Sequence, residues 1–192
     1  GQAPGVPFKM LTLIGILIVV LPFVLYFWTQ LKVSTPSLQW PAIAGPLKLQ
    51  FADNPARILG DWEGRHMTVE IQGTGVLVSM RLSQPSRLRI EVGPKEEVAK
   101  RAGMVVPDPV ATGDSAFDLR LLARCSDRAA GQEIFEAALR QNLMAQPIVD
   151  VLGAGDKVQW RLPTLRNCET LERLLQVMTI LATEMERFPS HA

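Results

Sequence analysis

The sequence predicts an α+β protein in which a single N-terminal transmembrane helix is followed by an antiparallel sheet covered by two main helices. Residues 10–28 form an apolar run of nineteen residues without a charge. Beyond residue 47, short segments alternate apolar and polar side chains, as strands with one buried face do. Residues 168–187 instead repeat leucine and methionine at steps of three and four, which is typical of an amphipathic helix. Hairpin strands joined to helices in this order indicate a layered α+β fold.

The run 10–28 is long enough to cross a bilayer. At a rise of about 1.5 Å per residue such a helix measures about 28 Å, close to the hydrocarbon thickness of about 30 Å. Apolar residues occupy all its sides, and aromatic residues, which favour the headgroup level, cluster at its second end. The residues that we expect to anchor the chain are Met10, Leu13, Ile16, Leu21, Pro22, Tyr26, Phe27 and Trp28.

Two other interpretations of this run are less consistent with its pattern. A cleaved signal peptide has an apolar core of about 7–15 residues and a small-residue cleavage site, whereas this run is longer and ends in bulky aromatic residues. A buried helix of a soluble domain would show one apolar stripe. Lys9 and Lys32 flank the run almost evenly, so the positive-inside rule leaves the membrane orientation open.

The composition predicts four parts along the chain. Residues 1–9 form a short tail, 10–28 the transmembrane helix, 29–46 a proline-containing linker that is extended over residues 33–46, and 47–192 a soluble α+β domain. All charged residues except Lys9 and Lys32 lie beyond residue 32, and the two signs balance there to leave a net charge of +1. A domain of this length is large enough to bury a core.

The hydrophobic period predicts the elements of this domain in order. Alternation predicts strands at 47–51, 66–72, 76–82, 87–92, 117–125 and 157–162, with 149–152 as a further partner strand. Helices are predicted at 96–103, 129–144 and 168–187. Gly73–Thr74–Gly75 is a hairpin turn in this scheme, and Asn167 is the N-cap of the last helix.

No catalytic, metal or cofactor site is predicted. The balanced charge gives no footprint for nucleic acid. His66 and His191 lack a second ligand at metal-binding spacing, and neither a nucleophile elbow nor a phosphate-binding loop occurs. Two carboxylate pairs, Asp61 with Glu63 and Asp114 with Asp118, fit turns and polar strand faces better than acid–base catalysis.

The two cysteines leave an alternative open. Cys125 and Cys168 are 43 residues apart, with no CxxC pair that would indicate a zinc or iron–sulfur site. They are two free thiols in a reducing compartment, or one disulfide in an oxidising one.

Three arginines are the only candidate contact residues of the predicted domain. Arg81, Arg87 and Arg89 alternate with apolar residues on strands that we expect to pair. This pattern is typical of a solvated sheet face. The same face is a candidate contact for anionic lipid headgroups or an acidic partner.

The sequence resembles a loose group of uncharacterised bacterial single-pass membrane proteins. The matching residues are Gly64–Arg65, Thr112–Gly113–Asp114, Phe117–Asp118 and the helix from Cys168, within residues 57–187. The resemblance implies an N-terminal transmembrane helix before an α+β domain, and a domain that faces the cytoplasm. It implies no activity and no catalytic residue.

These observations favour a non-enzymatic accessory subunit of a multi-subunit membrane complex in the bacterial inner membrane. Its partners would be membrane lipid and other membrane-protein subunits, with no nucleic acid and no cofactor, and a photosynthetic or respiratory complex is one candidate host. A membrane-tethered module that binds a small ligand or a protein is the alternative. An enzyme is the third hypothesis, and it would need His66 or the carboxylates gathered in a cleft.

Overall fold

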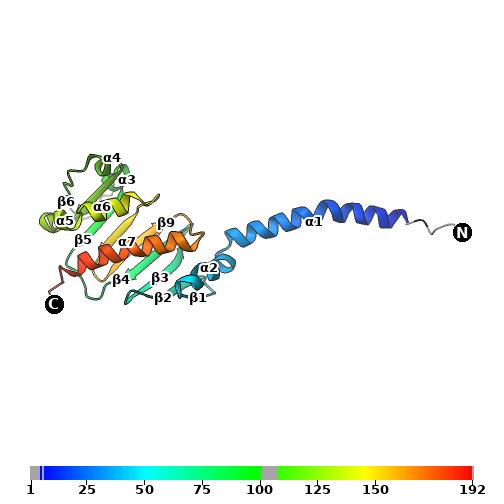
Figure 1. Ribbon diagram of the computed structural model, residues 1–192, viewed down its shortest axis with the longest axis horizontal. Helices are drawn as coiled ribbons and strands as arrows, with labels where there is room; N and C mark the ends of the chain where they lie inside the picture. The colour runs from blue at the N-terminus through cyan, green and yellow to red at the C-terminus, as the bar shows by residue number, and fades with distance from the viewer. Residues whose placement is uncertain (1–4, 6, 101–107, 192) are drawn as a thin grey trace. The chain divides into compact units, whose positions relative to one another are not determined.

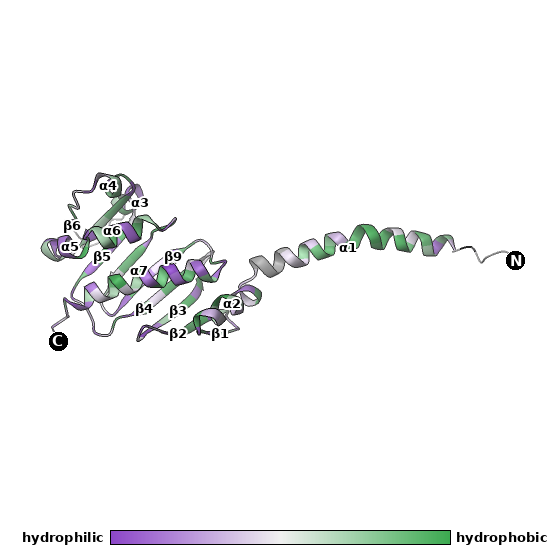
Figure 2. Ribbon diagram, in the orientation of Figure 1, coloured by the Kyte–Doolittle hydropathy of each residue, from purple (hydrophilic) through white to green (hydrophobic). Residues whose placement is uncertain are grey.

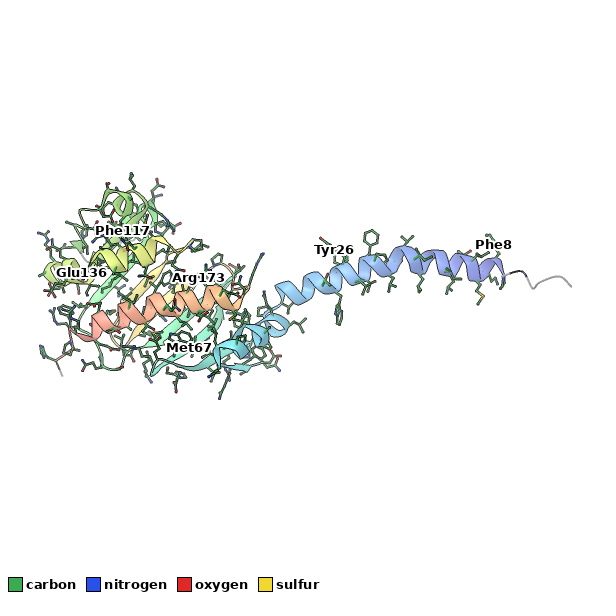
Figure 3. All side chains as sticks on the ribbon, viewed as in Figure 1. Phe8, Tyr26, Met67, Phe117, Glu136 and Arg173 are labelled. Atoms are coloured by element: carbon green, nitrogen blue, oxygen red, sulfur yellow. The ribbon has the colours of Figure 1, made fainter. Side chains whose placement is uncertain are left out.

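The first helix, α1 (Phe8–Ser34), contains the whole apolar run. The computed structural model describes residue 5 and residues 7–100 and 108–191, which cluster into two compact units, Gly1–Gln39 and Trp40–Ala192. In the first unit, Phe8–Thr29 is long and apolar enough to cross a membrane. Figure 2 shows α1 coloured as apolar over most of its length, and Figure 3 shows its side chains, Phe8 and Tyr26 among them, projecting away from the helix.

The predicted extended linker is wrong over most of its length. Residues Pro36–Ala44 form the helix α2, and Gly45–Leu47 form a 3₁₀ turn, η1. Pro36 occupies the first helical position, where its missing N–H costs nothing. Trp40 and Ile43 are buried at 1% and 2% exposure, so their burial in the core outweighs the cost of Pro41 inside the helix.

The second unit is built on an antiparallel sheet, as predicted. Nine strands occur among the described residues, and they lie in the order β1-β2-β3-β4-β9-β8-β5-β7-β6 with every pairing antiparallel (Figure 1). The strands are β1 (Gln50–Ala52), β2 (Arg57–Trp62), β3 (Arg65–Gln72), β4 (Gly75–Arg81), β5 (Arg89–Pro94), β6 (Asp108–Pro109), β7 (Leu121–Cys125), β8 (Val151–Ala154) and β9 (Lys157–Leu162).

Most of the sheet lies where the sequence predicts strands, but one of its longer strands was not predicted. The hairpin β3–β4 and the hairpin β8–β9 fall where alternation predicts them. The first predicted strand, 47–51, begins three residues later at Gln50 because η1 precedes it. Strand β2 was not predicted, because Gly60 and Asp61 interrupt its apolar pattern.

Two predictions of helix and strand between residues 115 and 144 are wrong. The strand predicted at 117–125 begins as a helix, α4 (Ser115–Arg120), and becomes β7 only at Leu121. Asp114 starts α4 because its carboxylate accepts a hydrogen bond of 3.2 Å from the Phe117 N–H. The single helix predicted at 129–144 is two, α5 (Arg128–Ile134) and α6 (Ala137–Met144).

A change of backbone direction separates α5 from α6. Phe135 leaves the helical region with φ −84° and ψ 50°, and its side chain is 1% exposed. The break allows Phe135 and Leu139 both to reach the core. The helix predicted at 96–103 is α3 (Lys95–Lys100), and its residues 101–103 lie outside the described residues.

The last helix, α7 (Cys168–Glu186), seals the apolar face of the sheet. Figure 1 shows it crossing the strands, and it contacts β4 and β9. Asn167 caps it as predicted, accepting a hydrogen bond of 2.8 Å from the Thr170 N–H. The stripe that it buries is Leu171, Leu174, Leu175, Val177, Met178, Leu181, Ala182 and Met185.

Two contacts fix the second half of α7 against the strands. At Gly153 in β8, a Cβ would collide with the Met185 Sδ, so the glycine lets this methionine pack directly on the strand. At the end of the helix, the Glu186 carboxylate accepts two hydrogen bonds, of 2.9 and 2.8 Å, from the Arg65 guanidinium in β3. This bidentate pair lowers the pKa of Glu186.

Truncation of the α7 stripe tests this account of the core. Leu175 is fully buried, so we expect Leu175→Ala to lower the free energy of unfolding by about 2–5 kcal/mol through lost burial and a residual cavity. Gln176→Ala, on the exposed side of the same helix, is the matched control and should change it by less than about 0.5 kcal/mol. Denaturant unfolding of the full chain in detergent measures both, and equal effects would contradict the packing described.

Candidate functional site

The candidate site is the sheet face turned away from the apolar core. Strand residues alternate between the two faces, and those opposite the core include a group of polar side chains on β3, β4 and β9. We call this surface the polar face and define it by Thr68, Ser79, Arg81, Lys157 and Gln159. Thr68, Ser79 and Gln159 are directly opposite one another on β3, β4 and β9, and they are half-buried.

The three predicted arginines do not lie on paired strands. Arg81 ends β4 and Arg89 begins β5, but β9 and β8 lie between these strands. The register nevertheless places Arg81 opposite Lys157, Lys157 opposite Ala154, and Ala154 opposite Arg89. Arg81, Lys157 and Arg89 therefore form one cross-strand row, which we call the basic row. Lys157 was not predicted as a contact residue, because its place beside Arg81 depends on the β4–β9 pairing.

Carboxylates of the same domain pair with each predicted arginine. Arg81 lies 3.5 Å from Asp156, and Arg89 lies 3.1 Å from Glu91. Arg87 precedes β5, and its Nη1 donates a hydrogen bond of 2.9 Å to Asp127. The Arg87 guanidinium also lies 5.3 Å from the centre of the Phe188 ring. These pairs reduce the net positive potential that an acidic partner or an anionic headgroup would meet.

Two small hollows mark the polar face. The first has a volume of about 200 Å³ and is lined by His66, Thr68, Ser79, Met80, Arg81, Asp156 and Lys157. The second, of about 190 Å³, is lined by Arg89, Glu91, Asp150, Leu152, Gln159 and Arg161. Sites for small molecules usually measure about 300–1,000 Å³ and are mostly apolar. These hollows suit a few polar atoms of a partner better than an enclosed small ligand.

The only histidine–carboxylate pair that the structure describes lies at the edge of this face. The His66 Nδ1 is 3.5 Å from the Asp61 carboxylate, and the two side chains are 50% and 79% exposed. General acid–base catalysts usually work where burial adjusts their pKa. Within the described residues, no group of three His, Cys, Asp or Glu side chains is placed to hold a metal ion.

The other candidate polar residues have structural contacts. Asp114, the N-cap of α4, also lies 3.2 Å from the Arg140 Nε, and Asp118 accepts a hydrogen bond of 2.7 Å from the Thr112 hydroxyl. Cys125 is buried and Cys168 half-buried, and both are free thiols. Burial raises the pKa of the Cys125 thiol, so it packs as a neutral side chain rather than reacting as a thiolate.

One solved structure has a similar fold. It is the crystal structure of the mycobacterial trehalose monomycolate transport factor A, TtfA, with a TM-score of 0.58 over 78% of this chain and 93% of that chain. The sequence identity is 8%, so the likeness concerns the fold alone. No protein-family model and no curated protein matches the sequence. The bacterial resemblance expected from the sequence is thus supported at the level of architecture, by one mycobacterial protein.

The Arg87–Asp127 contact allows a test of the electrostatics around the predicted arginines. Asp127 caps α5, and hydrogen bonds from the Ala130 N–H and then from Arg87 hold the pKa of its carboxyl below the usual value. We expect Arg87→Gln to raise the pKa of Asp127 while leaving it below that value, because the backbone donor remains. Since this pKa is lower in the folded than in the unfolded chain, ionised Asp127 favours folding at neutral pH, and the contribution disappears as the pH falls through the folded-state pKa.

Carboxyl-carbon NMR titration of the full chain measures this pKa. Arg81→Gln is the control, because Arg81 is paired with Asp156 and should leave Asp127 unchanged. An Asp127 pKa that is the same in Arg87→Gln and in the parent would contradict the contact.

Proposed function

We propose that this protein is a non-enzymatic accessory subunit of a membrane-protein complex, anchored by α1 and using its α+β domain to brace the complex. The observation that carries the proposal is the character of α1. Its apolar segment, Phe8–Thr29, is exposed on all sides in the described structure and has no polar face that water would solvate. A lipid bilayer, or helices of partner subunits within one, provides the surroundings that such a helix requires.

The domain supports an accessory role in a second way. The three arginines predicted as contact residues are each paired with a carboxylate of the same domain, and the polar face offers shallow contacts rather than an enclosed reaction site. TtfA is a transport factor, and at 8% identity it supports an accessory role by analogy of fold only. A transport assembly is accordingly one class of host. The photosynthetic or respiratory host considered from the sequence gains no support from the comparisons.

The proposed location is the bacterial inner membrane, with the domain on the cytoplasmic side. The apolar helix and the bacterial resemblance support the membrane, while the side rests on the resemblance alone. A membrane-tethered binding module remains the second candidate function, because the two hollows of the polar face present converging polar groups. In that case a soluble partner would cover the basic row.

Purification in mild detergent tests the accessory role. We expect the tagged full chain, extracted from its native membrane, to co-purify with at least one other membrane protein at a constant ratio. Native mass spectrometry measures that ratio. Recovery as a lone monomer or a simple homodimer would contradict the proposal.

A substitution in the middle of α1 tests whether this helix anchors the protein in the membrane. Val19→Arg places a charge at the centre of the span at a cost of about 2.5–3.5 kcal/mol, so we expect less membrane insertion and loss of the co-purifying partner. Val19→Leu keeps the helix apolar and should behave as the parent. If the Val19→Arg variant stays in the membrane fraction and still co-purifies with the partner, α1 is not the anchor.

A further inference from the structure

A third hollow lies where the segment after α6 passes the beginning of α7. Its volume is about 200 Å³, and most of its lining is apolar. Leu162 of β9 and Leu174 of α7 line it, but they are only 7% and 1% exposed, so they form its floor. Pro147 and Ile148 are exposed and form one wall. Because Leu162 and Leu174 belong to the core, this hollow lies on the α7 side of the sheet, away from the polar face.

Hydrogen bonds from two side chains of the domain hold this wall in place. The Arg120 guanidinium donates to the carbonyl oxygens of Gln146 and Pro147. The Trp160 indole N–H donates a hydrogen bond of 3.2 Å to the carbonyl oxygen of Ile148. The hollow is therefore a fixed feature of the fold, as binding sites for small molecules usually are.

Gln146 contributes a buried amide group to the hollow. The residue is 8% exposed and lines the hollow. Its backbone carbonyl accepts from Arg120, but its side-chain amide makes no hydrogen bond with any residue that the structure describes. Buried polar groups without a partner are unfavourable and uncommon in folded proteins. A ligand in the hollow that accepts a hydrogen bond would satisfy this amide.

The beginning of α7 gives the hollow a positive electrostatic potential. Asn167 and Thr170 line it, so it adjoins the first turn of a helix of 19 residues. Asn167 accepts from the Thr170 N–H, while the N–H groups of Cys168 and Glu169 have no hydrogen-bond partner among the described residues. Such a helix end favours a negative charge, and Arg166 in the lining adds a positive one. The Glu169 side chain is outside the lining.

The size of the hollow limits what it can hold. At about 30 Å³ for each water-sized group, a volume of 200 Å³ has room for about seven such groups. Sites for drug-sized molecules are larger, at about 300–1,000 Å³. An apolar floor, a hydrogen-bond donor and a helix N-terminus together suit a short hydrocarbon chain that ends in an anionic group.

We propose that this hollow binds a short-chain carboxylate. The hydrocarbon chain would lie on Leu162 and Leu174 beside Ile148, and the carboxylate would accept a hydrogen bond from the Gln146 amide and face the beginning of α7. The site lies outside the polar face and does not depend on how the domain is placed relative to α1. It therefore adds a ligand to the protein whether or not the accessory role holds.

Methyl NMR of the full chain in phosphatidylcholine nanodiscs tests the proposal, with hexanoate as the probe. Hexanoate is ionised at neutral pH, and its eight non-hydrogen atoms are close to the capacity of the hollow. We expect the Ile148 methyl signal to shift in a saturable manner. The Ile134 methyl should not shift, because Ile134 adjoins the residue that contacts the opposite end of α7, where Glu133 meets Arg187.

Hexanol has the same chain without the charge and should bind severalfold more weakly, after correction for its uptake by empty nanodiscs. The absence of a saturable Ile148 shift with hexanoate would overturn the site. Equal affinities for hexanoate and hexanol would overturn the assignment of a carboxylate.

A substitution of Gln146 tests the role of its amide. Gln146→Met keeps a side chain of similar size without the hydrogen-bond donor, so we expect hexanoate to bind severalfold more weakly. Gln141→Met, at an exposed position of α6 outside the lining, is the matched control and should bind as the parent does. Unchanged affinity in a folded Gln146→Met chain would overturn the role of the amide.

An exposed residue of the lining keeps the test valid if Gln146→Met does not fold. Thr164 is exposed, so Thr164→Glu and Thr164→Gln should both leave the thermal unfolding temperature nearly unchanged. The added charge of Thr164→Glu should weaken hexanoate binding severalfold relative to Thr164→Gln, while hexanol binds equally to both. Equal hexanoate affinities in this pair would contradict the placement of the carboxylate in the hollow.

Discussion

The packing of α7 on the sheet is the contact on which the rest of the domain depends. The sheet has one strongly apolar face, and without α7 the residues of β4 and β9 beneath it would be exposed to water. Burying that face is the main favourable contribution to folding. The approach of Met185 to Gly153 and the bidentate Arg65–Glu186 pair then fix where along the strands the helix rests. On the other side of the sheet, the pairings of β3 with β4 and of β4 with β9 set which residues of the polar face lie opposite one another.

The C-terminal part of the chain completes a sheet that the earlier part leaves open. Strands β8 and β9 insert between β4 and β5, which would otherwise be edges exposed to other chains. This insertion brings Arg81 and Arg89 into one row with Lys157, although more than sixty residues separate Lys157 from either arginine along the chain. The basic row is therefore a product of long-range pairing, and the Asp156 and Glu91 carboxylates offset the charge of its two arginines.

The sequence by itself determined the parts that depend on local pattern. The apolar helix, the hairpin β3–β4, the strand β9 and α7 with its Asn167 cap all follow from periodicity or capping, because neighbouring residues decide them. Only the tertiary structure decided the rest. Burial of Trp40 made a helix of the proline-rich linker, and a cap at Asp114 turned the start of a predicted strand into α4. The basic row comes from strand pairings between distant segments, which no local pattern encodes.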